Sequence, residues 1–198
     1  MWASQGCEPT SSSSLRLGTL VPPEKGFKAP GGRGAAIELL IERVLDWERR
    51  GVQTEVVTAD QHADGAFLHA YVARRGPARA DEVARLLERH GGCSAGCTIA
   101  SVDPLGFVHA CQFWGGVSLG NVRVRRFSEI WRDPDNPTLC DLRGKRDRLK
   151  GKCAECAYRE VCGGCRVRAE AVYGDAWAED PACYLAAQER AGCLAASP

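Results

Sequence analysis

Four cysteines within thirteen residues restrict what this chain can fold into more than any other feature of its sequence. They are spaced Cys153-x2-Cys156-x5-Cys162-x2-Cys165, and thiols this close along a chain cannot all avoid one another. A two-residue spacing also lets two sulfur atoms face one metal centre from a single turn of the backbone. The spacing therefore predicts either a metal-binding or a cross-linked segment.

The other cysteines favour metal binding over cross-links. Eleven cysteines occur in 198 residues, and ten of them follow residue 90. Residues 1–14 lack the charged start and apolar run of a signal peptide, and no stretch approaches the roughly 18 apolar residues that span a bilayer. We therefore expect a cytoplasmic protein, and in a reducing compartment clustered cysteines indicate metal binding. The net charge of +1 gives no field that favours nucleic acid or a membrane.

Eight cysteines are candidate metal ligands. Besides the four above, they are Cys183 and the upstream residues Cys93, Cys97 and Cys111. Thiolate sets completed by a distant cysteine bind iron–sulfur clusters, so eight ligands suffice for two [4Fe–4S] clusters. Four thiolates also suit tetrahedral zinc, and disulfides are a third possibility. The remaining cysteines are predicted to be small apolar residues rather than ligands, and these are Cys7, Cys140 and Cys193.

Hydrophobic patterning predicts a mixed α/β chain. Residues 1–15 are serine-rich and predicted to be disordered, and the Gly- and Pro-rich residues 16–33 a loop. The apolar positions of 35–50 share one helical face, and β-branched residues at 52–58 indicate a strand. Four further helices are predicted, at 81–90, 127–131, 137–149 and 166–173. The segments 98–103 and 107–113 flank Pro-Leu-Gly and predict a β-hairpin.

Asp60, His62 and Asp64 follow the predicted strand and are candidate substrate contacts. Parallel α/β folds place their active-site loops beyond the C-terminal ends of strands. Because the three residues alternate, their side chains are predicted to share one side of an extended loop. A simple turn, in which Asp and Gly cap the backbone, is the alternative.

Basic and aromatic residues near the cysteines also have more than one interpretation. The basic run at 143–152 is interpreted as a solvated helix face, with attraction of a carboxylate-rich ligand as the alternative. Arg166 and Arg168 follow a candidate ligand, where their charge would offset an anionic cluster or simply lie at the surface. Three tryptophans are predicted to pack in a core rather than to line a macrocycle site, and these are Trp114, Trp131 and Trp177.

The cysteine pattern resembles the SPASM domain of radical S-adenosylmethionine (SAM) enzymes. It reads Cys93-x12-Gly106-x4-Cys111, then the four-cysteine segment, then Cys183. Its last pair, CGGC, has two intervening residues where the common pattern has three, as in the tetrapyrrole-modifying branch. Other strings resemble the proteins of alternative haem and haem d1 biosynthesis in that branch, and these are HADG at 62–65, GCSAG at 92–96, CQFW at 111–114, LGNVR at 119–123, FSEIW at 127–131, CGGCRVRAEAVYGD at 162–175 and AEDPACYL at 178–185. The resemblance covers roughly residues 50–190.

The resemblance implies a fold and a set of domains. The fold is α/β, with the C-terminal remnant of a partial (β/α) radical SAM barrel followed by an irregular α+β SPASM iron–sulfur domain. The implied parts are a disordered or loop N-terminus at 1–33, the last αβ elements of the barrel at 34–90 and an auxiliary-cluster domain at 91–198. One cluster is then assigned to Cys153, Cys156, Cys162 and Cys183, and the other to Cys93, Cys97, Cys111 and Cys165.

The same resemblance implies a function in haem biosynthesis. The full enzyme would remove acetate side chains from didecarboxysiroheme to give iron-coproporphyrin. A haem d1 or terminal haem synthase-type step, and a non-catalytic iron–sulfur electron-transfer module, are the alternatives. Implied partners are an iron tetrapyrrole, an electron donor such as a ferredoxin, and a separate radical SAM subunit if the enzyme is split.

One motif of the family does not occur in these residues. A CxxxCxxC loop binds the cluster that holds S-adenosylmethionine in the full-length family, and none is found here. The chain is therefore expected to be a truncated gene, a fragment or one subunit of a split enzyme, and to be inactive by itself.

Overall fold

The computed structural model describes residues 15–17, 32–90 and 92–192. The chain divides into two compact units, 1–60 and 61–198, and each is described by itself. The disorder predicted for 1–15 lies outside the described residues except at Leu15. The domain boundaries expected at 33/34 and 90/91 remain predictions.

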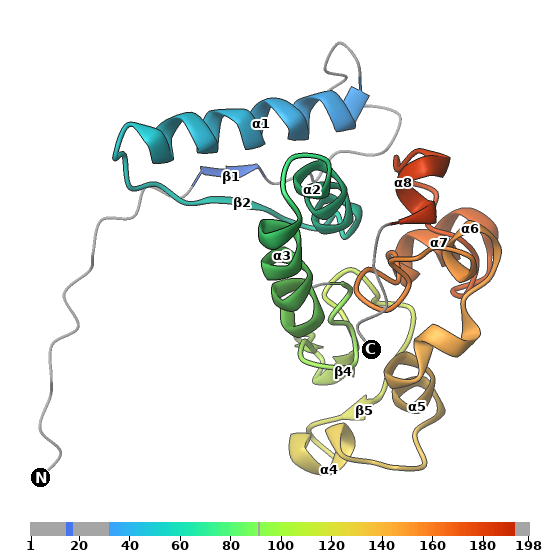
Figure 1. Ribbon diagram of the computed structural model, residues 1–198. Helices are drawn as coiled ribbons and strands as arrows, with labels where there is room; N and C mark the ends of the chain where they lie inside the picture. The colour runs from blue at the N-terminus through green and yellow to red at the C-terminus, as the bar shows by residue number, and fades with distance from the viewer. Residues whose placement is uncertain (1–14, 18–31, 91, 193–198) are drawn as a thin grey trace, which may run out of the picture. The chain divides into compact units, whose positions relative to one another are not determined.

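The first unit contains two parallel strands with a helix between them along the chain (Figure 1). The elements are β1 (Leu15–Leu17), α1 (Gly32–Arg49) and β2 (Val56–Thr58). Leu15 pairs with Val56 in the parallel register. The helix predicted at 35–50 is confirmed, whereas the strand predicted at 52–58 is limited to its last three residues.

The loop predicted at 16–33 is wrong at both of its ends. Strand β1 continues to Leu17, and helix α1 already begins at Gly32. A strand of three residues has no alternating pattern of its own, and its pairing with β2 supplies the hydrogen bonds that define it. A helix between parallel strands is the repeating unit of a (β/α) barrel. Two such short strands do not make up a barrel, so the barrel remnant remains a prediction.

The second unit begins with two helices that pack against each other (Figure 1). They are α2 (Ala63–Ala73) and α3 (Pro77–His90). Helix α3 begins four residues before the predicted Asp81, because proline is favoured in the first turn of a helix. Helix α2 was not predicted, since its buried residues surround much of its circumference and leave no apolar stripe. These are Ala63, Asp64, Ala66, Phe67, His69 and Tyr71.

A small antiparallel sheet follows, with its strands in chain order. The strands are β3 (Ser101–Val102), β4 (Phe107–His109) and β5 (Gly120–Asn121). In the β3–β4 turn, the Asp103 carboxylate accepts the backbone N–H groups of Leu105 and Phe107, both at 2.9 Å. The predicted hairpin is confirmed, and the third strand is an addition that the sequence pattern did not predict.

Short helices make up the rest of the second unit. They are α4 (Phe127–Trp131), α5 (Pro137–Arg143), the 3-10 helix η2 (Lys145–Arg148), α6 (Gly151–Ala154), α7 (Arg166–Tyr173) and α8 (Ala187–Ala191). The helices predicted at 127–131 and 166–173 are confirmed. The helix predicted at 137–149 ends at Gly144, where the backbone leaves the α-helical path. None of the helices in the described part of the chain is long and apolar enough to cross a membrane.

A hydrophobic core joins the sheet to helices α4 and α5. Its buried residues are Val108, Ala110, Trp114, Leu119, Ile130, Leu139 and Leu142. Trp131 and Trp177 pack against this core. The prediction that the three tryptophans pack in a core is confirmed.

Helix α2 is also fixed by a buried polar contact. His69 on α2 and Tyr158 are both buried, and His69 Nδ1 lies 2.8 Å from Tyr158 Oη. Burial lowers the pKa of His69, because the charged imidazolium is poorly solvated there. The neutral ring is therefore part of the folded state.

We expect mild acid to destabilise the fold through His69. Because its pKa is lowered in the folded chain, the unfolded chain binds the proton first, and stability is lost as the pH falls below about 6.5. Denaturant unfolding at about pH 7 and about pH 5.5 measures this loss. A His69→Gln variant should lose less stability between the two pH values than the unsubstituted chain, and equal losses would contradict the prediction.

Candidate metal centres

Four cysteines line one cavity of the second unit, which has an empty volume of about 350 Å³. Cys153 lies on α6, Cys156 follows that helix, Cys162 precedes α7, and Cys183 lies in the segment before α8. These are the four residues that the resemblance assigns to one cluster, and the structure brings them together. Three cationic side chains also line the cavity, and these are Lys152, Arg159 and Arg190.

The cavity is unfavourable for free thiolates. Burial raises the pKa of Cys162 to about 12, and the neighbouring thiolates would add like charge. Burial also raises the pKa values of Cys156 and Cys183. Metal cations remove this penalty, because they replace the thiol protons and supply the opposite charge. The electrostatics of the cavity therefore suit a bound metal centre.

Each of these four sulfur atoms accepts a backbone N–H. Asp180 N donates to Cys153 Sγ at 3.3 Å. In the other cases the donor lies two residues after the cysteine, and the pairs are Cys156 with Tyr158, Cys162 with Gly164 and Cys183 with Leu185. Hydrogen bonds to the ligand sulfurs are one of the means by which proteins stabilise and tune iron–sulfur clusters. The donor set fits such a cluster.

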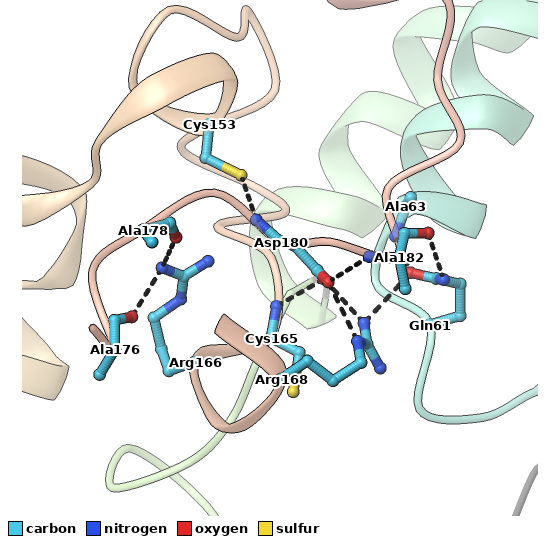
Figure 2. Close-up of polar contacts among 10 residues, drawn as sticks. All are labelled: Gln61, Ala63, Cys153, Cys165, Arg166, Arg168, Ala176, Ala178, Asp180 and Ala182. Carbon is cyan, nitrogen blue, oxygen red and sulfur yellow. Dashed lines mark hydrogen bonds and ion pairs between the residues drawn. The ribbon is translucent and has the colours of Figure 1, made fainter. Parts of the chain in front are cut away.

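Arg166 contributes a second observation that fits an anionic group. Its side chain is fully buried at 0% exposure, and Nη1 donates to the carbonyl oxygens of Ala176 and Ala178, both at 2.8 Å (Figure 2). Its Nε and Nη2 are buried with no hydrogen-bond partner among the described residues. A Cβ added to Gly164, which lines the cavity, would lie 2.7 Å from Arg166 Nη2. The alternative that Arg166 lies at the surface is wrong.

A second set joins Cys93 and Cys165 with His62. Although burial lowers the pKa of His62, its hydrogen bonds with Cys165 and Cys93 raise it to about 9. Burial raises the pKa of Cys93, but the bond with His62 and a backbone N–H from Ala95 lower it to about 7. The arrangement is a buried contact of an imidazole with two cysteines from distant segments, in which the charged forms of His62 and Cys93 stabilise each other.

Cys97 and Cys111 have other surroundings. Cys97 donates its thiol proton to the carbonyl oxygen of Leu142 at 3.7 Å. Cys111 is half-buried against the hydrophobic core. Their assignment to the cluster of Cys93 and Cys165 remains a prediction.

The two sets are not arranged around single points. In residues 32–90 and 92–192, no three His, Cys, Asp or Glu side chains converge closely enough to hold one metal ion. A [4Fe–4S] cluster offers a separate iron atom to each of its four cysteines, so its ligands surround a volume rather than a point.

The extended loop predicted at Asp60, His62 and Asp64 is wrong. Helix α2 begins at Ala63, so Asp64 lies in its first turn. There the buried Asp64 carboxylate accepts a hydrogen bond from Tyr184 Oη at 2.8 Å. Asp60 is exposed and has a positive φ of 62°. Substrate contact by these residues stays a prediction, which now concerns His62 above all.

The remaining candidates behave as structural residues. Cys140 is exposed and donates to the Pro134 carbonyl oxygen at 3.0 Å, and it is not among the residues that line the cysteine cavity. Cys7 and Cys193 lie outside the described residues. The basic run contributes ion pairs, and these are Arg146 with Glu160, Arg148 with Asp141, Lys150 with Asp175 and Lys152 with Glu179.

Sequence reasoning missed two residues that shape the sites. Tyr158 lines the cavity and holds α2, and Asp180 contacts both cysteine sets. Tyr158 lies two positions after Cys156, and Asp180 lies three positions before Cys183. Neither residue type is a common ligand in such a pattern, so only proximity to the motif pointed to them.

Residues 93–157 match the model of the SPASM family, described as an iron–sulfur cluster-binding domain. The match covers five of the eight candidate ligands, and the others lie beyond its C-terminal end. The chain therefore contains a SPASM domain.

Three curated relatives show which SPASM-containing proteins this chain is similar to. The chain is 44% identical over 158 residues to the Fe-coproporphyrin III synthase of Methanosarcina barkeri. The aligned region covers 78% of this chain and 40% of that protein. It is 43% identical over 194 residues to the pre-heme d1 synthase of Dinoroseobacter shibae, and the aligned region covers 92% of this chain and 47% of that protein. It is 31% identical over 172 residues to the AdoMet-dependent heme synthase of Methanosarcina barkeri, and the aligned region covers 79% of this chain and 46% of that protein. No solved structure matches the chain significantly.

The chain belongs to the radical SAM/SPASM proteins of the haem-biosynthesis branch. It spans less than half the length of the three relatives named above. The similarity to the pre-heme d1 synthase extends over more of the chain than the motifs at 50–190 do.

If the chain holds two clusters, we expect Cys153→Ala to lower the iron content of the anaerobically reconstituted chain by about half, because one of them would lose a ligand. Cys140→Ala is the matched control, since Cys140 is exposed and bonded to Pro134. Iron and acid-labile sulfide analysis measures the result. Equal iron in the two variants would remove Cys153 from the ligand set.

Proposed function

We propose that the chain is the cluster-binding part of a radical SAM enzyme that removes side chains from an iron tetrapyrrole, and that it holds two [4Fe–4S] clusters. One observation carries the proposal. Four thiols line a single cavity, and each of them accepts a backbone N–H. The matched SPASM domain supports iron rather than zinc as the metal.

The reaction proposed is removal of acetate side chains from didecarboxysiroheme to give iron-coproporphyrin. A relative with 44% identity is named for the synthesis of Fe-coproporphyrin III, which supports this product. A haem d1 step is the second candidate, because the pre-heme d1 synthase matches 92% of the chain. A terminal haem synthase-type step is supported at lower identity.

The clusters, when bound, would supply electron transfer or an anchor for the substrate. The residues of this chain have separate tasks around them. The thiolates of Cys153, Cys156, Cys162 and Cys183 would hold one cluster, and Cys93 and Cys165 with Cys97 and Cys111 the other. His62 would contact the tetrapyrrole beside the second cluster, and an electron donor such as a ferredoxin would complete the system.

A non-catalytic electron-transfer module is the alternative from another class. It would hold the same clusters and serve a partner, such as a separate radical SAM subunit. In either case we propose that these 198 residues alone do not cleave S-adenosylmethionine, since they contain no CxxxCxxC loop. Location in the cytoplasm is part of the proposal.

The decisive experiment is anaerobic reconstitution of the 198-residue chain with iron and sulfide. We expect a brown protein with about eight iron and eight sulfide per chain, as two [4Fe–4S] clusters require. Incubation of the reduced protein with S-adenosylmethionine should yield no 5′-deoxyadenosine. Stoichiometric zinc without sulfide in folded protein purified anaerobically would contradict the cluster assignment, and 5′-deoxyadenosine would contradict the expected inactivity.

The substrate class is tested by titrating the cluster-loaded chain with iron coproporphyrin III and following the tetrapyrrole absorption. We expect saturable binding that His62→Ala weakens about tenfold, or about 1.4 kcal/mol, without loss of iron. Unchanged binding would remove His62 from the substrate contacts. Loss of iron in His62→Ala would instead show that the imidazole serves the second cluster.

A further inference from the structure

Cys153 differs from four other cysteines of the two sets in where its N–H donor comes from. Cys93, Cys156, Cys162 and Cys183 each accept the N–H of the residue two positions later. Cys153 lies in the short helix α6. Its donor is the N–H of Asp180, which lies 27 residues further along the chain.

The side chain of Asp180 reaches the other cysteine set. Its Oδ2 accepts the backbone N–H of Cys165 at 2.8 Å, and its Oδ1 accepts that of Ala182 at 3.0 Å (Figure 2). Arg168 holds both oxygens, with Nε donating to Oδ1 at 3.0 Å and Nη2 to Oδ2 at 2.7 Å. The Asp180 side chain is 2% exposed and that of Arg168 is 29% exposed, so the carboxylate is shielded from water while the guanidinium is partly exposed.

The pair also extends to the segment that carries His62. Arg168 Nη2 donates to Gln61 Oε1 at 3.3 Å, and Gln61 Nε2 donates to the Ala182 carbonyl oxygen at 3.0 Å (Figure 2). One connected network therefore joins the first cavity, the N-terminus of α7 and the residue before His62. A shift of Asp180 would move groups at both cysteine sets.

The charges of the pair act on both sets of thiols. The Asp180 carboxylate disfavours the thiolate of Cys183 in the first set. The thiolates of Cys165 and Cys93 in the second set favour the charged form of Arg168. Removing Arg168 leaves the Asp180 carboxylate unbalanced in a buried, weakly screened position, and removing Asp180 leaves the partly exposed Arg168 without its partner.

We propose that Asp180 is a positioning residue shared by the two cluster sites, and that its ion pair with Arg168 sets the reduction potentials of both clusters. The inference rests on the proposed function. The Asp180 N–H donates to a ligand sulfur of one cluster, while the carboxylate fixes the backbone of a ligand to the other. Hydrogen bonds to sulfur and nearby charge both change how readily a cluster accepts an electron.

The test is redox titration of the reconstituted 198-residue chain, followed by electron paramagnetic resonance of both clusters. Asp180→Asn removes a negative charge near both clusters at constant shape, so both midpoint potentials should rise. Arg168→Gln removes the positive charge, so both should fall. The double variant restores the charge balance and should lie between the two single variants. A purely structural role would not give shifts of opposite sign.

Asp175→Asn is the matched control. Asp175 lies on the same segment, pairs with Lys150 at 2.6 Å and accepts the Trp177 N–H at 2.9 Å. It should leave both potentials close to those of the unsubstituted chain. Shifts of Asp180→Asn no larger than those of Asp175→Asn, or shifts of the same sign in both single variants, would overturn the inference.

Failure of the inference can be told apart from failure of the proposed function. If the unsubstituted chain binds no clusters, the proposed function fails before any variant is measured. If it binds two and the variants do not shift both potentials as stated, the inference alone fails. Should Asp180→Asn not load with iron, Arg168→Gln still tests the sign of the charge effect, since it should lower both potentials.

Discussion

Burial of several thiols around one small cavity is the constraint on which the rest of the second unit depends. Without metal, burial raises the pKa of Cys162 to about 12, so the cavity favours protonated sulfur. The fold offsets this cost for thiolates with backbone N–H donors and with cations at the cavity wall. The short helices and turns between 151 and 192 can be understood as the means of placing these donors.

The buried polar contacts connect this region to the helices that precede it. Tyr158 lines the cavity and bonds His69 on α2, and Tyr184 bonds Asp64 in the first turn of the same helix. Arg168, which is paired with Asp180, also donates to Gln61, two residues before α2. Helix α2 and the segment just before it are therefore held to the cysteine-rich part by side-chain hydrogen bonds.

Much of the local structure of the second unit could be predicted. The hairpin follows from the Pro-Leu-Gly turn between its two segments, and helices α4 and α7 lie at the predicted positions 127–131 and 166–173. Helix α2 could not be predicted, because a helix buried on most sides has no amphipathic period. Its absence from the prediction led directly to the error at Asp60, His62 and Asp64, which were placed on an extended loop.

The sequence alone places four thiols close together, because cysteines three or six positions apart must lie near one another in any fold. It also carries the family resemblance, which the SPASM match and the curated relatives confirmed. Only the packing of distant segments decides the contacts around these thiols. It brings His62 into hydrogen bonds with Cys93 and Cys165, and it places the Asp180 N–H against the Cys153 sulfur. Such contacts join residues 27 or more positions apart, so no local pattern encodes them, and they arise only when the buried surfaces of those segments come together.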